Sequence, residues 1–73
     1  MSYIIAENQF SNSNYEGAVD GFTSYLNKFA TGTHKLDAHY IRGESLSILN
    51  RYGAANADYE AVIKEGFSNY YES

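Results

Sequence analysis

The sequence repeats itself at an offset of 37 residues, and this repeat constrains the possible fold more than any other feature. The pairs that fall into register are Tyr3 with Tyr40, Glu7 with Glu44, Tyr15 with Tyr52, Ala18 with Ala55, Phe22 with Tyr59 and Leu26 with Ile63. A repeat of this length is typical of stacked structural units, each of which buries its apolar face against the next. We therefore expect the chain to contain two similar units.

The apolar residues within each unit have helical spacing. One helix face carries Ala18, Phe22, Tyr25, Leu26 and Phe29, and a second carries Ala55, Tyr59, Val62 and Ile63. Polar or glycine-containing segments at 11–14, 30–34 and 50–53 interrupt the pattern, and proline is absent. The sequence predicts an all-α fold of two helical hairpins, with helices near 2–11, 15–29, 36–49 and 53–65. Gly66 is expected to end the fourth helix, and a further helix is expected to start near Asn69.

Composition narrows the class of protein. The net charge of −4 argues against a surface for nucleic acid or an anionic membrane, both of which attract Lys and Arg. Cysteine is absent, so no disulfide or Cys-ligated zinc site is expected. No apolar run approaches the roughly 18–20 residues that span a bilayer. An apolar content of 44% and an aromatic content of 16% favour a folded chain over a disordered one.

Both hairpins contain an alanine that is followed by an aromatic residue one helical turn later. The residues are Tyr15-x2-Ala18-x3-Phe22-x2-Tyr25-Leu26 and Gly43-x8-Tyr52-x2-Ala55-x3-Tyr59-x2-Val62-Ile63. This pattern resembles the tetratricopeptide repeat (TPR), and residues 25–32 and 37–44 are most similar to bacterial envelope TPR proteins of the Tol–Pal-associated YbgF and BamD-like kinds. The resemblance implies two TPR-like units of a right-handed α-solenoid, with repeat 1 at about 2–35, repeat 2 at about 36–69 and the start of a third helix pair at 69–73.

The resemblance also implies a site, because the first helix of each TPR pair lines a concave groove. The residues expected to face a partner there are Tyr3, Glu7, Phe10, Asp37, Tyr40, Glu44 and Ser47. The spacing agrees, since Tyr3/Glu7 and Tyr40/Glu44 are i, i+4 pairs that share a helix face. The alternative is that the two tyrosines pack between repeats. The residues expected to pack the repeats together are Ala18, Phe22, Leu26, Gly43, Ala55, Tyr59 and Ile63.

The sequence offers no constellation for catalysis or metal binding. His34, Asp37 and His39 are the nearest approach to a metal site, but residues two apart do not share a helix face. We expect both histidines to be exposed or to cap a helix. The glycines are scattered, and no serine has a histidine within one helical turn. We therefore expect no metal, no cofactor and no enzymatic activity.

These observations favour a non-catalytic scaffold for protein–protein interaction, within a larger bacterial TPR protein. The acidic residues of the expected groove predict a basic or aromatic partner segment rather than an acidic C-terminal tail. The resemblance implies a location in the cell envelope or periplasm, and neither nucleic-acid binding nor membrane insertion is expected. Two alternatives stay open: a module for homo-oligomerisation, and an accessory domain of an enzyme that lies outside this chain.

Overall fold

A computed structural model describes residues 3–29 and 34–72, and their side chains as far as Glu65. It contains four helices: α1 (Tyr3–Ser11), α2 (Tyr15–Lys28), α3 (Lys35–Ile48) and α4 (Tyr52–Glu72). No strand occurs within the described ranges, so the all-α prediction is confirmed. Most of the loop expected at 30–34 lies outside the described residues.

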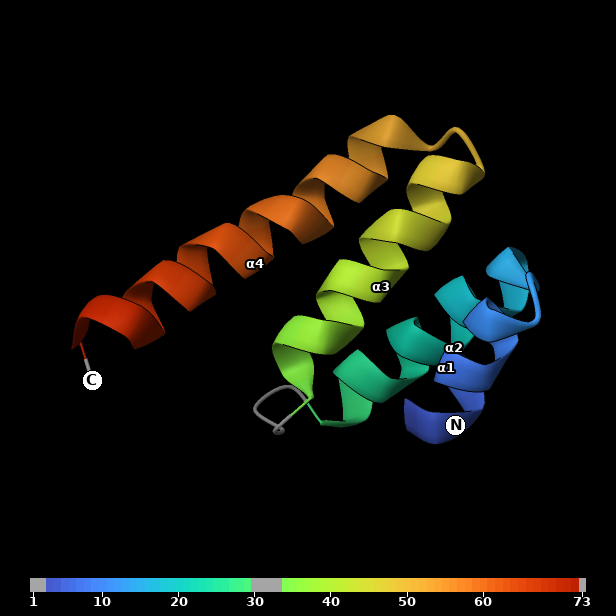
Figure 1. Cartoon of the computed structure of the whole chain (residues 1–73), viewed down its shortest axis with the longest axis horizontal. Coiled ribbons are helices and arrows are strands. Elements are labelled where there is room, and N and C mark those ends of the chain that lie inside the picture. The colour runs from blue at the N-terminus through green and yellow to red at the C-terminus, as the bar shows by residue number, and fades with distance from the viewer. Residues whose placement is uncertain (1–2, 30–33, 73) are drawn as a thin grey trace.

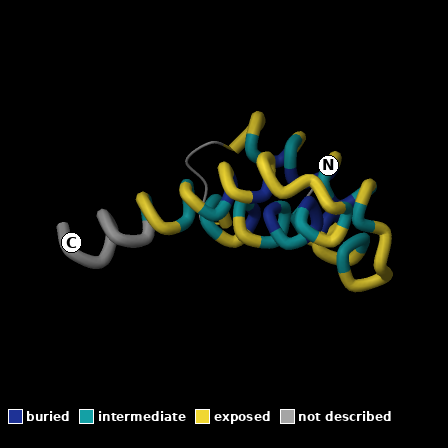
Figure 2. The backbone as a smooth tube through the Cα atoms, turned by 90° about the horizontal axis from the view of Figure 1, so that it is seen from above, coloured by how far each residue is buried: buried dark blue, intermediate teal, exposed yellow. Residues whose placement is uncertain are grey.

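The helices form two hairpins, α1–α2 and α3–α4, and α3 lies between α4 and the first hairpin (Figure 1). The α1 helix touches α3, whereas α2 and α4 are not packed against each other in the described part of the chain. Buried positions lie in the interior of the helix assembly, and exposed positions lie on its outer sides (Figure 2). The main core cluster consists of Ala6, Ala18, Phe22, Tyr25 and Ala38. Small residues dominate this set, so the helix backbones approach closely around a few large rings.

The turn inside each hairpin is the clearest structural repeat. Ser13 and Asn50, which are 37 residues apart, both adopt the left-handed conformation, with φ of 65° and 64°. The same two backbone hydrogen bonds close each turn. In the first turn, Asn14 N–H donates to Gln9 O at 2.8 Å and Ser13 N–H donates to Phe10 O at 3.0 Å. In the second turn, Arg51 N–H donates to Leu46 O at 2.8 Å and Asn50 N–H donates to Ser47 O at 3.0 Å. This pair of bonds defines a Schellman motif, which satisfies the last carbonyls of a helix. The sequence repeat therefore extends to the backbone geometry.

A close approach of helices also recurs in the two hairpins. Ala6 and Gly43 are equivalent in the repeat, and both are buried. A methyl group added to Gly43 would lie 2.9 Å from Cε1 of Tyr59 and 3.3 Å from Cβ of Asp58. Any larger residue at this position would force the Tyr59 ring to shift, so glycine allows the closest approach of α3 to α4. The first hairpin tolerates alanine at the equivalent position.

The fourth helix is longer than expected. It continues through Gly66 to Glu72, so the predicted end at Gly66 and the predicted helix start near Asn69 are both wrong. Glycine ends a helix efficiently only when it takes a left-handed conformation, and no glycine in the described residues does so. Inside a helix it costs only about 1 kcal/mol relative to alanine. Residues 66–72 carry α4 beyond Glu65, the equivalent of the last residue of α2, and this end extends past α3 (Figure 1).

The close approach at Gly43 predicts opposite effects for two glycine substitutions. Gly43→Ala should lower the free energy of unfolding by about 1 kcal/mol, because the cost of overpacking, about 1–3 kcal/mol, exceeds the gain in helix propensity. Gly53→Ala is the matched control, since nothing lies within 4 Å of its added methyl group. It should raise stability by up to about 1 kcal/mol. Urea denaturation of both variants measures the difference, and equal stabilisation would contradict the close α3–α4 contact.

Candidate functional site

Each of the two equivalent tyrosines of the repeat has a glutamate one turn later whose carboxylate raises the pKa of its phenol. Glu7 acts in this way on Tyr3 of α1, and Glu44 acts on Tyr40 of α3. Burial, followed by the charges of Asp37 and Glu7, raises the pKa of Tyr3 to about 12. The hydrogen bond to Glu44 and the charge of that carboxylate raise the pKa of Tyr40. Both carboxylates therefore favour the protonated phenol, which is already the form that tyrosine takes at neutral pH.

The ring of Tyr3 is a packing element. It stacks on His34 with centroids 4.2 Å apart and an interplanar angle of 11°. It also meets Phe22 edge-on at 5.8 Å and Tyr25 in a tilted arrangement at 5.7 Å. The ring thus fills the corner where α1, α2 and the start of α3 meet. These three contacts lie within the first repeat, so Tyr3 packs inside that repeat and does not stand open on a groove.

Tyr40 is the exposed member of the pair. Its side of α3 faces solvent, and 49% of the residue is exposed although the ring contacts Tyr59 at a centroid distance of 6.1 Å. Ile48, two turns further along α3, is 50% exposed. Tyr40, Glu44 and Ile48 follow one another at intervals of four residues and so form one row on the helix surface. Ser47, which was predicted to face the groove, precedes Ile48 in the chain, and the four-residue spacing from Tyr40 and Glu44 leads to Ile48 instead.

The remaining predicted residues divide between packing and exposure. Phe10 is half-buried and meets Tyr15 edge-on at 5.6 Å, so it packs inside the first hairpin. Ser47 is half-buried beside the second turn, where its carbonyl accepts a bond from Asn50. The expected packing residues Ala18, Phe22, Gly43 and Ala55 are buried, and Leu26 and Tyr59 are partly buried. Ile63 differs, since it is 69% exposed and does not pack as expected.

The exposed surface of α1 and α3 is acidic. We define the acidic face by Glu7, Asp37, Tyr40, Glu44 and Ile48. Glu7 and Asp37 both lie close enough to the Tyr3 hydroxyl to raise its pKa, so the two helices bring these carboxylates together. The cations of α3 point to α4 instead: Lys35 Nζ lies 2.7 Å from Glu65, and Arg42 bonds Asp58. The carboxylates of the acidic face are therefore not neutralised by these two side chains, and the face attracts positive charge.

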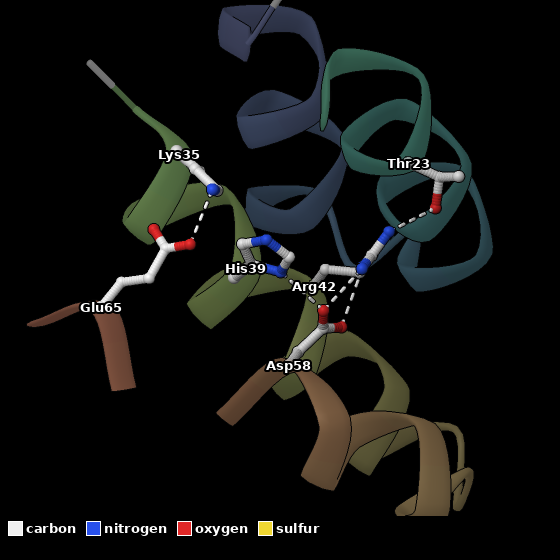
Figure 3. Close-up of polar contacts among 6 residues, drawn as sticks. All are labelled: Thr23, Lys35, His39, Arg42, Asp58 and Glu65. Atoms are coloured by element: carbon white, nitrogen blue, oxygen red, sulfur yellow. Dashed lines mark hydrogen bonds and ion pairs between the residues drawn. The ribbon is translucent and has the colours of Figure 1, made fainter. Parts of the chain in front are cut away.

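A polar network on the opposite side of α3 was not anticipated (Figure 3). Asp58 of α4 is only 2% exposed. Arg42 donates to it through Nε at 2.9 Å and through Nη2 at 2.6 Å, and His39 Nδ1 lies 2.9 Å from its Oδ1. The third Arg42 bond, from Nη1 to Thr23 Oγ1 at 3.1 Å, reaches α2. The network therefore joins three helices.

A hollow of about 310 Å³ opens beside this network, between α2 and α4. Its lining residues are Val19, Thr23, Arg42, Leu46, Ala54, Ala57 and Asp58. The hollow forms because α2 and α4 are not packed against each other above α3. The polar lining residues Thr23, Arg42 and Asp58 bond one another in the network. The other lining side chains are apolar.

Both histidines contact other side chains of the fold. His39 is only 17% exposed in its side chain and bonds Asp58, so the expectation of an exposed or capping residue is wrong for it. His34 is the residue before α3, but its side chain makes no capping bond; it stacks on Tyr3 and lies 3.9 Å from Asp37. Within the described part of the chain, no three potential metal ligands come together.

Comparisons of the chain with known protein families, with curated proteins and with solved structures found no match. Within residues 3–29 and 34–72, no helix has both the length and the apolarity needed to cross a membrane.

The buried network predicts a large effect of Asp58→Asn. The substitution leaves the Arg42 guanidinium without its counter-charge, and removing one partner of a buried pair costs about 3–5 kcal/mol. We expect the lower end of this range, because the Arg42 side chain keeps 21% exposure. Thr23→Val is the control, since it removes one bond and leaves the ion pair, at a cost of about 1–2 kcal/mol. Thermal unfolding followed by circular dichroism compares the stability of the two variants. Equal losses of stability would contradict the central role of Asp58.

Proposed function

We propose that this chain is a non-catalytic protein-interaction module, and that the acidic face of α1 and α3 binds a partner segment rich in basic and aromatic residues. The observation that supports this most directly is the half-exposed Tyr40 ring next to carboxylates that the cations of α3 leave unpaired. Exposed aromatic side chains are enriched at protein interfaces and often anchor them.

The chemistry of the face favours Arg or Lys in the partner. Carboxylates accept charge-assisted hydrogen bonds from both, and Arg can bind a carboxylate through two parallel bonds. The ring of Tyr40 offers a π surface for the same cations. A partner ending in a free carboxylate or in acidic side chains would meet like charge instead.

The wider assignment to TPR-like proteins is part of the same proposal. Its support is the sequence resemblance together with the repeated Schellman turn and the repeated tyrosine–glutamate pair. On this proposal the two hairpins are units of a right-handed α-solenoid, in a larger bacterial protein of the cell envelope. The chain then acts as a scaffold, and its function depends on the partner that it holds.

A peptide-binding experiment tests the proposal. Peptides of equal length, ordered from acidic to basic and with or without Tyr, are titrated against the protein at low and high salt. We expect the basic, Tyr-containing peptides to bind best and to weaken as salt rises, because the contacts are partly exposed. Tighter binding of acidic peptides would contradict the proposal.

Two variants assign this binding to the acidic face. The double variant Tyr40→Ala, Glu44→Gln should lower the affinity for the basic peptides by about tenfold, the loss expected for an interface anchor. Tyr52→Ala is the control for loss of an exposed ring, because Tyr52 is 58% exposed and its hydroxyl bonds the neighbouring Asn50 side chain at 2.7 Å. It should bind as the wild type does. Equal weakening by both variants would place the binding site elsewhere.

A further inference from the structure

The hollow between α2 and α4 combines apolar walls with one group of polar side chains. The apolar part of its lining consists of Val19, Leu46, Ala54 and Ala57. Thr23, Arg42 and Asp58 lie next to one another in the lining, because they are joined by hydrogen bonds (Figure 3). Its volume of about 310 Å³ falls at the lower end of the range for ligand pockets, roughly 300–1,000 Å³, and this mixture of side chains is typical of them.

The polar side chains of the hollow have hydrogen-bond donors to spare. A guanidinium carries five N–H groups. Arg42 uses three of them, from Nε and Nη2 to Asp58 and from Nη1 to Thr23, so one N–H on each terminal nitrogen has no acceptor among the described residues. Thr23 Oγ1 accepts the bond from Arg42, and its own O–H likewise has no acceptor in the described part of the chain. Two N–H groups and one O–H group are therefore available to a ligand.

Acceptors and net charge are not available in the same way. The Asp58 carboxylate is only 2% exposed and already accepts bonds from Arg42 and His39. Its charge balances the charge of the Arg42 guanidinium, with which it forms an ion pair at 2.6 Å. A cationic ligand would meet the guanidinium, and an anionic ligand would meet the carboxylate. The hollow therefore favours a ligand that accepts hydrogen bonds and carries no charge.

We propose that the hollow binds a small neutral molecule that has a carbonyl oxygen and a compact apolar body. The carbonyl oxygen has two lone pairs and accepts bonds from Arg42 and Thr23. The apolar body lies against Leu46 and the two alanines of α4. Binding leaves the ion pair with Asp58 in place, because it uses donors that the network does not. A ligand of this size has few atoms to contribute, so its affinity is in the millimolar range.

This site is separate from the acidic face. Arg42 and Tyr40 are two residues apart on α3, so their side chains leave the helix in different directions. The lining of the hollow shares no residue with the acidic face. The proposal therefore goes beyond the proposed function, and either of the two can fail without the other.

Three probes with the same six-membered ring test the ligand chemistry: cyclohexanone, cyclohexylamine and cyclohexanecarboxylate. At neutral pH they present a neutral acceptor, a cation and an anion, respectively. Each is titrated into the ¹⁵N-labelled protein, and the backbone amide signals are followed by NMR. Cyclohexanone should shift the signals of the lining residues until they saturate. The two charged probes should bind about tenfold more weakly, the change produced by one poorly matched polar group.

Variants of α4 locate the binding in the hollow. Ala57→Leu should lower the affinity for cyclohexanone by at least about tenfold, because the larger side chain takes the space of the ring. Ala54→Leu is a second variant of the same kind, and both alanines are exposed, so the helix keeps its packing. Asn56→Leu is the matched control, since it adds the same side chain at an exposed position of α4 outside the lining. Circular dichroism checks the helix content of each variant.

Four results would overturn the proposal. Cyclohexanone could produce no saturable shift at the lining residues, or a charged probe could bind as tightly as cyclohexanone. Both alanine variants could bind cyclohexanone as the wild type does, or Asn56→Leu could lose binding as they do. The expected result is saturable binding of cyclohexanone by the wild type and by Asn56→Leu, with weaker binding in every other combination.

Discussion

The arrangement of the helices depends on the buried carboxylate of Asp58. A charge that is 2% exposed is tolerated only when it is paired and hydrogen-bonded. Arg42 provides two parallel bonds, His39 provides a third contact, and the remaining Arg42 nitrogen reaches Thr23 on α2. One side chain of α4 is thereby linked to both α3 and the first hairpin. The network is not repeated, because Gly21 and Ile5 stand at the positions equivalent to Asp58 and Arg42. It fixes the second hairpin and its attachment to the first.

Features that depend on neighbouring residues could be predicted from the sequence. The helical spacing gave the four helices, and Asn14 caps α2 by accepting a bond from the Gly17 N–H at 3.2 Å, as expected for Asn before a helix. The repeat predicted equivalent hairpins, and the turns at Ser13 and Asn50 agree although their sequences differ. The end of α4 could not be predicted in this way. Gly66 is compatible with both an end and an interior position, and only its backbone conformation decides between them.

Features that depend on the orientation of one helix against another could not be predicted. Asp58 interrupts the apolar stripe of α4 between Ala55 and Val62, which indicates a buried charge, but its partner can be identified only once α3 is placed. His39 and Arg42 are three residues apart and share the face that meets α4. The same limit explains Tyr3 and Tyr40, which have identical local spacing. Tyr3 is covered because His34 stacks on it, whereas Tyr40 remains half-exposed.

The acidity of the exposed face follows from the way in which the cations are used in contacts with other parts of the fold. Lys35, Arg42 and Arg51 each reach across to another element and pair with Glu65, Asp58 and Glu16, respectively. The exposed Arg51–Glu16 pair contributes little to stability, but the buried Arg42–Asp58 pair is essential to the packing. Tyr40 and Arg42 are two residues apart, so their side chains leave α3 in different directions. The structural role of Arg42 therefore withdraws a cation from the Tyr40 side, where Glu44 remains available to a partner.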